Sequence, residues 1–200
     1  MATSRAITRN NIKTLTITAI MLAITAVMSF TPLGTIHLPI VSLTLAFLPA
    51  IITVVAVGFW PGVFVAFSAG VFSLARAFMV PTILAPFLQN PLASVFPRVM
   101  IAVVAFLVFK ALSQTKLPKT MSVAVAAAAG SVANTVGVLG MIWLLYGSAM
   151  HDVAVSQGHT GVWAMYVGIV TSNAALEVVG NTFIATAIIM TLYKAKLAKI

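Results

Sequence analysis

Long apolar runs alternate along the chain with short polar or proline-rich segments. No Lys, Arg, Asp or Glu occurs within residues 14–75 or within residues 120–151. Because a helix needs about 20 mostly apolar residues to cross a bilayer, these runs predict membrane-spanning helices. The pattern indicates an all-α membrane protein whose single domain, residues 1–200, is a bundle of six transmembrane helices. We place these helices at about 12–31, 40–58, 62–79, 91–112, 120–146 and 162–193.

Proline, glycine and one asparagine mark the predicted breaks between the helices. Residues 32–39 contain two prolines and a glycine, which cannot continue a helix. Residues 80–90 form a second break, where Asn90 is a predicted N-cap followed by a proline at the first helical position. A very tight turn at Phe59-Trp-Pro-Gly62, a polar, basic turn over residues 113–119 and a polar loop over residues 147–161 complete the connections.

Composition and charge agree with a membrane protein and give it an orientation. The chain is 62% hydrophobic and 6% charged, whereas soluble domains carry about 25% charged residues. A net charge of +9 can indicate nucleic-acid binding, but most of the basic residues lie in three short clusters beside the apolar runs, which is a topology signal instead. With six helices all three clusters face one side, so we expect both termini in the cytoplasm and a ligand site that opens outside. The clusters are Arg5/Arg9/Lys13, Lys110/Lys116/Lys119 and Lys194/Lys196/Lys199.

Motifs for catalysis are missing from the sequence. The chain has no cysteine and two acidic residues, and it has no HExxH, no GxSxG and no glycine-rich phosphate loop. We therefore expect neither an enzyme nor a bound metal or cofactor. Any active transport is expected to draw its energy from partner subunits or from an ion gradient.

Arg76, Arg98 and Glu177 are the charged residues predicted within helices away from the basic clusters. A charge at that depth costs about 3 kcal/mol on insertion scales, so each one is a candidate functional residue. Arg98 follows Pro97 in its helix, and we expect it to contact a ligand; the alternative is a structural ion pair with Glu177. Arg76 lies near a helix end, where we expect its side chain to extend to the membrane surface.

Polar residues also gather on the last two helices. Asn173, Glu177 and Asn181 are spaced four residues apart and share one helix face, while Ser131 and Asn134 lie on the preceding helix. Such side chains can hold the hydroxyl and amide groups of a ligand, but they can equally bind membrane helices to one another. For Asn134 and Asn173 both interpretations stay open, whereas Asn181 is expected to be structural.

Four features together resemble the substrate-binding S components of energy-coupling factor (ECF) vitamin transporters. They are the segment Ala19-Ile-Met-Leu-Ala23, the proline-rich loop after it, the segment Gln89-Asn-Pro-Leu-Ala-Ser-Val-Phe-Pro-Arg98, and the pair Asn173 and Glu177 in the last helix. The resemblance covers nearly the whole chain, and the segment that ends at Arg98 is most similar to the pantothenate-type members.

The resemblance implies a role, partners and a location. An S component binds its vitamin tightly without hydrolysing anything, and it docks on a transmembrane T subunit driven by two ATPase subunits. It is a multi-pass protein of the bacterial plasma membrane that contacts lipid and no nucleic acid. Ala19 and Ala23 would then pack on the T subunit, the alternative being that they pack inside the bundle. The expected substrate-binding residues are Thr35, His37, Gln89, Asn90, Arg98, Asn134, Asn173 and Glu177.

Pantothenate is the expected vitamin, because its carboxylate, hydroxyl and amide groups suit Arg98 and the asparagines. Riboflavin is the second choice, since it would need more stacking surface than Trp143 and Trp163 supply. Thiamine, biotin or a stand-alone secondary transporter remain alternatives. Against the stand-alone transporter, Glu177 is the only acidic residue predicted within a helix, and no inverted pair of broken segments marks an ion site.

Overall fold

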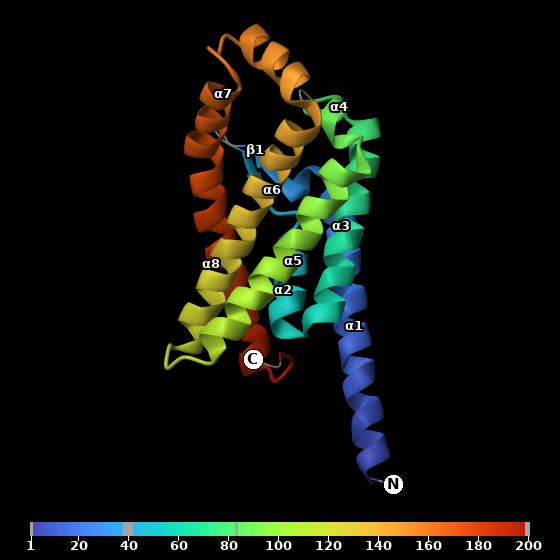
Figure 1. Ribbon diagram of the computed structural model, residues 1–200. Helices are drawn as coiled ribbons and strands as arrows, with labels where there is room; N and C mark the ends of the chain where they lie inside the picture. Colours follow the sequence, from blue (N-terminus) through green and yellow to red (C-terminus); the bar gives the residue numbers. More distant parts are fainter. Residues whose placement is uncertain (1, 38–41, 83, 199–200) are drawn as a thin grey trace.

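The protein is a bundle of long helices that lie side by side, with a short β-hairpin between them (Figure 1). The computed structural model describes residues 2–37, 42–82 and 84–198. Its helices are α1 (Ala2–Phe30), α2 (Leu48–Ala56), α3 (Phe59–Met79), α4 (Ala85–Leu88), α5 (Pro91–Ser113), α6 (Lys119–Ser156), α7 (Val162–Ile169) and α8 (Ala175–Lys194). A 3-10 turn (Pro32–Gly34) leads into strands β1 (Thr35–His37) and β2 (Ser42–Thr44), and one π-helical turn (Val170–Ala174) joins α7 to α8.

Among the described residues, five helices are long and apolar enough to cross a membrane. They are Asn11–Phe30, Phe59–Met79, Pro91–Ser113, Lys119–Ser156 and Ala175–Lys194. The prediction of a multi-pass helical membrane protein agrees with these spans. The predicted helix at 40–58 is the exception, because α2 has nine residues and a length of about 14 Å, which is less than the bilayer core of about 30 Å.

Part of the first half of that predicted helix is β2, which forms an antiparallel pair with β1; residues 40 and 41 lie outside the described residues. Thr35 pairs with Thr44 and His37 with Ser42 in antiparallel register. The helix begins only at Leu48, so that Pro49 occupies the first turn, where a proline costs no hydrogen bond. Every residue of α2 is buried, as expected for a short helix that is apolar on all sides. The prediction of a helix was therefore wrong over residues 42–47.

The predicted loop at 147–161 is also shorter in the structure. Helix α6 continues to Ser156 past a kink at Tyr146, whose backbone angles (φ −139°, ψ 29°) are not helical. The predicted stop at residue 146 thus marks a bend, which Gly147 and the serine after it make easy. Only residues 157–161 connect α6 to α7.

Two apolar clusters hold the bundle together. The larger one surrounds α2 and includes Ile51, Ile101 and Ile189, all fully buried. Helices α2 and α3 approach each other closely in this cluster, because a Cβ at Gly62 of α3 would overlap Val54 of α2. The smaller cluster joins α4, α6 and α7 through side chains that include Met150.

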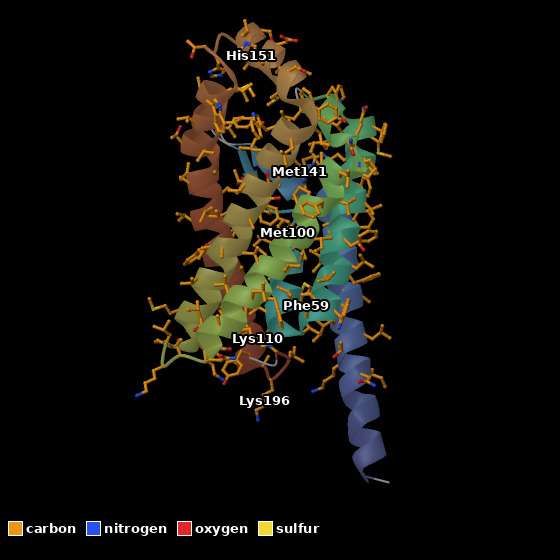
Figure 2. All side chains as sticks on the ribbon, in the orientation of Figure 1. Phe59, Met100, Lys110, Met141, His151 and Lys196 are labelled. Atoms are coloured by element: carbon orange, nitrogen blue, oxygen red, sulfur yellow. The ribbon has the colours of Figure 1, made fainter. Side chains whose placement is uncertain are left out.

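The two ends of the bundle differ in charge. Lys110 and Lys196 lie at one end, and His151 lies at the other (Figure 2). Both chain termini are also at the lysine end (Figure 1). This arrangement agrees with the prediction that the basic clusters share one face of the protein.

Candidate functional site

A pocket of about 610 Å³ opens between the two apolar clusters. Its walls come from the end of α1, the segment after β2, the second half of α3, α4, the start of α5, the α6–α7 loop and α7. These elements meet in the half of the bundle away from the termini (Figure 1). Phe47 of the larger cluster and Met165 of the smaller one both line it. The volume lies in the range of small-molecule sites, which are mostly apolar with a few polar groups.

Arg98 places one positive charge on the pocket wall. It lies in the second turn of α5, directly after the buried Pro97. Its Nη2 donates a 3.1 Å hydrogen bond to Ser73 Oγ of α3, and Ser73 also lines the pocket. Its Nη1 is buried without a hydrogen-bond partner among the described residues. Leaving a buried donor unpaired is costly, so a ligand that supplies an acceptor for Nη1 would be bound favourably.

Arg76 places a second positive charge on the same pocket. It follows Ser73 by three residues on α3, so the two side chains share one helix face. From its place near a helix end, Arg76 was expected to extend to the membrane surface, whereas the structure places it in the pocket lining. Two guanidinium groups in one mostly apolar pocket favour an anionic ligand.

Glu177 lies close enough to Arg98 for the two charges to interact, but it does not receive the guanidinium's hydrogen bond, which goes to Ser73. The carboxylate is half-buried, and its Oε1 has no hydrogen-bond partner in the described part of the chain. The same holds for Asn134 Oδ1 and Ser131 Oγ on α6, both buried. These acceptors lie inside the bundle and are not part of the pocket lining.

The asparagine and glutamine at the start of α5 contact the protein itself. Asn90 Oδ1 accepts from Leu92 N at 3.0 Å, which confirms the predicted N-cap, and its Nδ2 donates to the Tyr146 hydroxyl at 3.1 Å. Gln89 Nε2 donates to the carbonyl of Ala77 at 3.3 Å. Neither residue is part of the pocket lining, although both brace helices that form the pocket.

For three predicted site residues the structure describes the backbone alone. Thr35 and His37 lie in β1, and Asn173 lies in the π-helical turn between α7 and α8; their side chains lie outside the described part. Such π-helical turns occur frequently at functional sites. Asn181 donates from Nδ2 to the carbonyl of Thr44 at 3.3 Å, which attaches β2 to α8 and agrees with its expected structural role.

The sequence matches the family described as ECF transporter, substrate-specific component, over residues 13–189. The chain belongs to this family. A comparison with individual curated proteins finds no match. As an S component the chain is a substrate-binding subunit and not itself an enzyme, and the family works with a T subunit and an ATPase module.

Two small residues on the first helix of this S component face outward. Ala19 and Ala23 are exposed, whereas Met21 and Thr25 on another face of α1 are buried in the bundle. The alternative in which the alanines pack inside the bundle is therefore wrong. Their face is open to a neighbouring helix.

The pocket of this S component also contains residues that the sequence pattern did not predict. Gln157 and His159 reach the pocket from the α6–α7 loop, because α6 extends beyond the residue where the sequence predicted its end. The tryptophans do not contribute to it: Trp143 and Trp163 pair with each other at 6.0 Å between ring centroids and are 46% and 69% exposed. Among the described lining residues, Phe47 is the one Phe, Tyr or Trp.

Proposed function

We propose that this S component binds pantothenate for an ECF importer of the bacterial plasma membrane. The observation that carries the proposal is the presence of both Arg76 and Arg98 in one largely apolar pocket. Pantothenate has one carboxylate, two hydroxyls and an amide on a short aliphatic frame. A carboxylate can take two parallel hydrogen bonds from a guanidinium, and the apolar wall suits the aliphatic part.

The charge balance of the site supports an anion over the other vitamins. Two guanidinium groups line the pocket and one carboxylate, Glu177, lies near Arg98, so the site is positive overall. Thiamine is a cation and would be repelled. Riboflavin is uncharged and binds best between aromatic rings, for which Phe47 is a single described candidate. Biotin carries a carboxylate but lacks the hydroxyls of pantothenate.

Hydroxyl groups along the wall suit the polar end of pantothenate. Ser29 of α1, Thr44 of β2, Ser73 of α3 and Thr82 all line the pocket. Hydroxyls can both donate and accept, so they can pair with the ligand's hydroxyl and amide groups. Asn134 of α6, Asn173 of the π-helical turn and Glu177 of α8 are proposed to join them when the vitamin is bound, and Thr35 and His37 from β1.

The proposed role includes an orientation and a coupling face. We place the lysine end of the bundle in the cytoplasm, because basic residues beside membrane helices are retained there, and the pocket toward the outside. The six-helix arrangement then consists of five spanning helices and the short buried α2. Ala19 and Ala23 form the face that receives the T subunit, since small residues let membrane helices approach closely.

Three measurements test this function. Mass spectrometry of small molecules retained by the detergent-purified chain should detect pantothenate, and calorimetry should rank pantothenate above its alcohol analogue, biotin, riboflavin and thiamine. Tighter binding of riboflavin would overturn the substrate and leave the family role intact. Co-purification should recover a T subunit and two ATPases; uptake by the chain alone would favour a stand-alone transporter instead.

A further inference from the structure

A second, smaller pocket lies at the lysine end of the bundle. Its volume is about 140 Å³, and it is formed by the first membrane turns of α1, the end of α2 and the turn after α8. Lys13 of α1 and Lys196 of the C-terminal turn both line it, together with the apolar side chains of Ile17 and Leu197. Residues from the two ends of the chain thus place two ammonium groups at one small pocket.

The backbone at Lys196 is unusual. Its φ of 57° is left-handed, and it is the one residue other than glycine with a positive φ in the described part of the chain. Lys196 N donates to Tyr193 O at 3.0 Å and Leu197 N to Leu192 O at 2.9 Å, a helix ending in which glycine is the usual residue at the left-handed position. The left-handed conformation is unfavourable for a lysine, but it places the lysine at the pocket.

The two lysines have no acidic residue of the chain to neutralise them at this pocket. The sequence contains two acidic residues, Asp152 and Glu177. Asp152 lies near the end of α6, next to His151 at the opposite end of the bundle (Figure 2), and Glu177 lies near Arg98. Because two like charges repel each other at short range, their convergence favours a bound anion.

The surface of α1 indicates which anion it is. Lys13, Ile17, Ile20, Ile24 and Val27 follow one another at intervals of four and three residues, so they share one face of the helix. Ile20, Ile24 and Val27 are 51%, 37% and 53% exposed. This stripe extends about 21 Å from Lys13, at about 1.5 Å per residue, which exceeds half of the hydrocarbon core of about 30 Å.

We propose that Lys13 and Lys196 bind the phosphate of an anionic phospholipid whose acyl chain lies along this stripe of α1. The lysines sit at the edge of the first membrane span, Asn11–Phe30, where headgroups lie. Basic pockets between membrane helices bind such headgroups. The stripe adjoins the face that carries Ala19 and Ala23, since Ala23 lies three residues after Ile20 and four residues before Val27.

The test uses the delipidated full chain in detergent without vitamin, titrated with phosphatidylglycerol while its melting temperature is followed. Phosphatidylglycerol should raise the melting temperature, whereas phosphatidylcholine with the same acyl chains should not. The double variant Lys13→Gln/Lys196→Gln should bind phosphatidylglycerol roughly 30-fold more weakly, at about fivefold per lysine. Lys13→Arg/Lys196→Arg should retain binding.

A matched control removes the same charge from the same end of the bundle. Lys110→Gln/Lys116→Gln changes two exposed lysines outside the pocket and should leave the lipid titration unchanged. Equal losses in both double variants would overturn the proposal in favour of diffuse attraction. If inorganic phosphate alone raised the melting temperature to saturation, the site would bind a free anion. If the Lys13→Gln/Lys196→Gln variant had a lower melting temperature without lipid, the two lysines would instead contact the carbonyls that end α2. Either outcome overturns the proposal.

Discussion

Arg98 Nη2 donates a 3.1 Å hydrogen bond to Ser73 Oγ, and this contact joins α5 to α3 at the pocket wall. The bond holds the guanidinium in place before any ligand arrives. Its Nη1 has no hydrogen-bond partner among the described residues, so it is available to a ligand. A preset cation of this kind binds a carboxylate with little loss of side-chain entropy.

Replacing Arg98 tests whether its guanidinium pairs with the carboxylate of the vitamin. Removing one side of a hydrogen-bonded, buried charge pair costs about 2–5 kcal/mol, so Arg98→Ala should weaken pantothenate binding by roughly 30-fold to several thousand-fold. Arg98→Lys should give an intermediate loss, because it keeps the charge but not the forked geometry. Isothermal titration calorimetry measures both.

The competing role of Arg98 is to balance Glu177 within the fold. In that case Arg98→Ala would lower the melting temperature strongly without ligand, and adding Glu177→Gln would restore much of it. Unchanged affinity for the uncharged alcohol analogue, together with a large loss for the acid, would support the carboxylate contact. If wild type binds the alcohol as tightly as the acid, Arg98 is not a carboxylate ligand.

Arg76→Gln should weaken binding of the acid by about tenfold, the lower end of the 1.5–3 kcal/mol range for a hydrogen bond to a charged group. The low value reflects its position near the end of α3, where water screens the charge. Calorimetry with pantothenate and its alcohol analogue measures the difference. An equal loss for both ligands would mean that Arg76 supports the fold rather than reading the charge.

Ala19→Leu and Ala23→Leu should abolish uptake while the isolated chain still binds its vitamin. Both alanines are exposed on α1, so larger side chains block a partner helix without disturbing the bundle. Radiolabelled uptake and calorimetry measure the two effects. Ala187→Leu, at an exposed position of α8, is the matched control and should transport normally. Normal uptake by the α1 variants would contradict the proposed coupling face.

Asn90 and Tyr146 should contribute to stability more than to binding. Tyr146→Phe removes one hydrogen bond and should cost about 1 kcal/mol of unfolding free energy, whereas Asn90→Ala also removes the N-cap and should cost about 2 kcal/mol. Asn90→Ser keeps a capping hydroxyl and should resemble Tyr146→Phe. Unfolding in denaturing detergent gives these values. A large loss of vitamin affinity with unchanged stability would instead place Asn90 in the binding site.

Single cysteines test the orientation, since the chain has no native cysteine. Ser156→Cys should react with a membrane-impermeant thiol reagent on intact cells, because it lies near the end of α6 that faces outside in our proposal. Ser4→Cys and Ser113→Cys should react only after the cells are opened. The reverse labelling pattern would invert the topology while leaving the fold unchanged.

The sequence by itself determined the class of this protein, because the length and hydropathy of a membrane span are local properties. The apolar run at 91–112 predicted α5 to within a residue, and Asn90 followed by proline predicted its beginning. The break at residue 147 was visible as well, although the structure makes it a bend. Even the late start of α2 had a signal in Pro49, which the run of Ile, Val and Leu around it concealed.

The site depended on contacts between distant segments. Arg76 and Arg98 lie 22 positions apart in the sequence on different helices, and only the packing of α3 against α5 makes them walls of one pocket. Likewise, the alanines at 19 and 23 could face inward or outward on any amphipathic or apolar helix. Residues 42–44 became a strand because pairing with residues 35–37 satisfied their backbone groups. Hydropathy predicts that a segment is buried from water, but it does not determine which other segment it packs against.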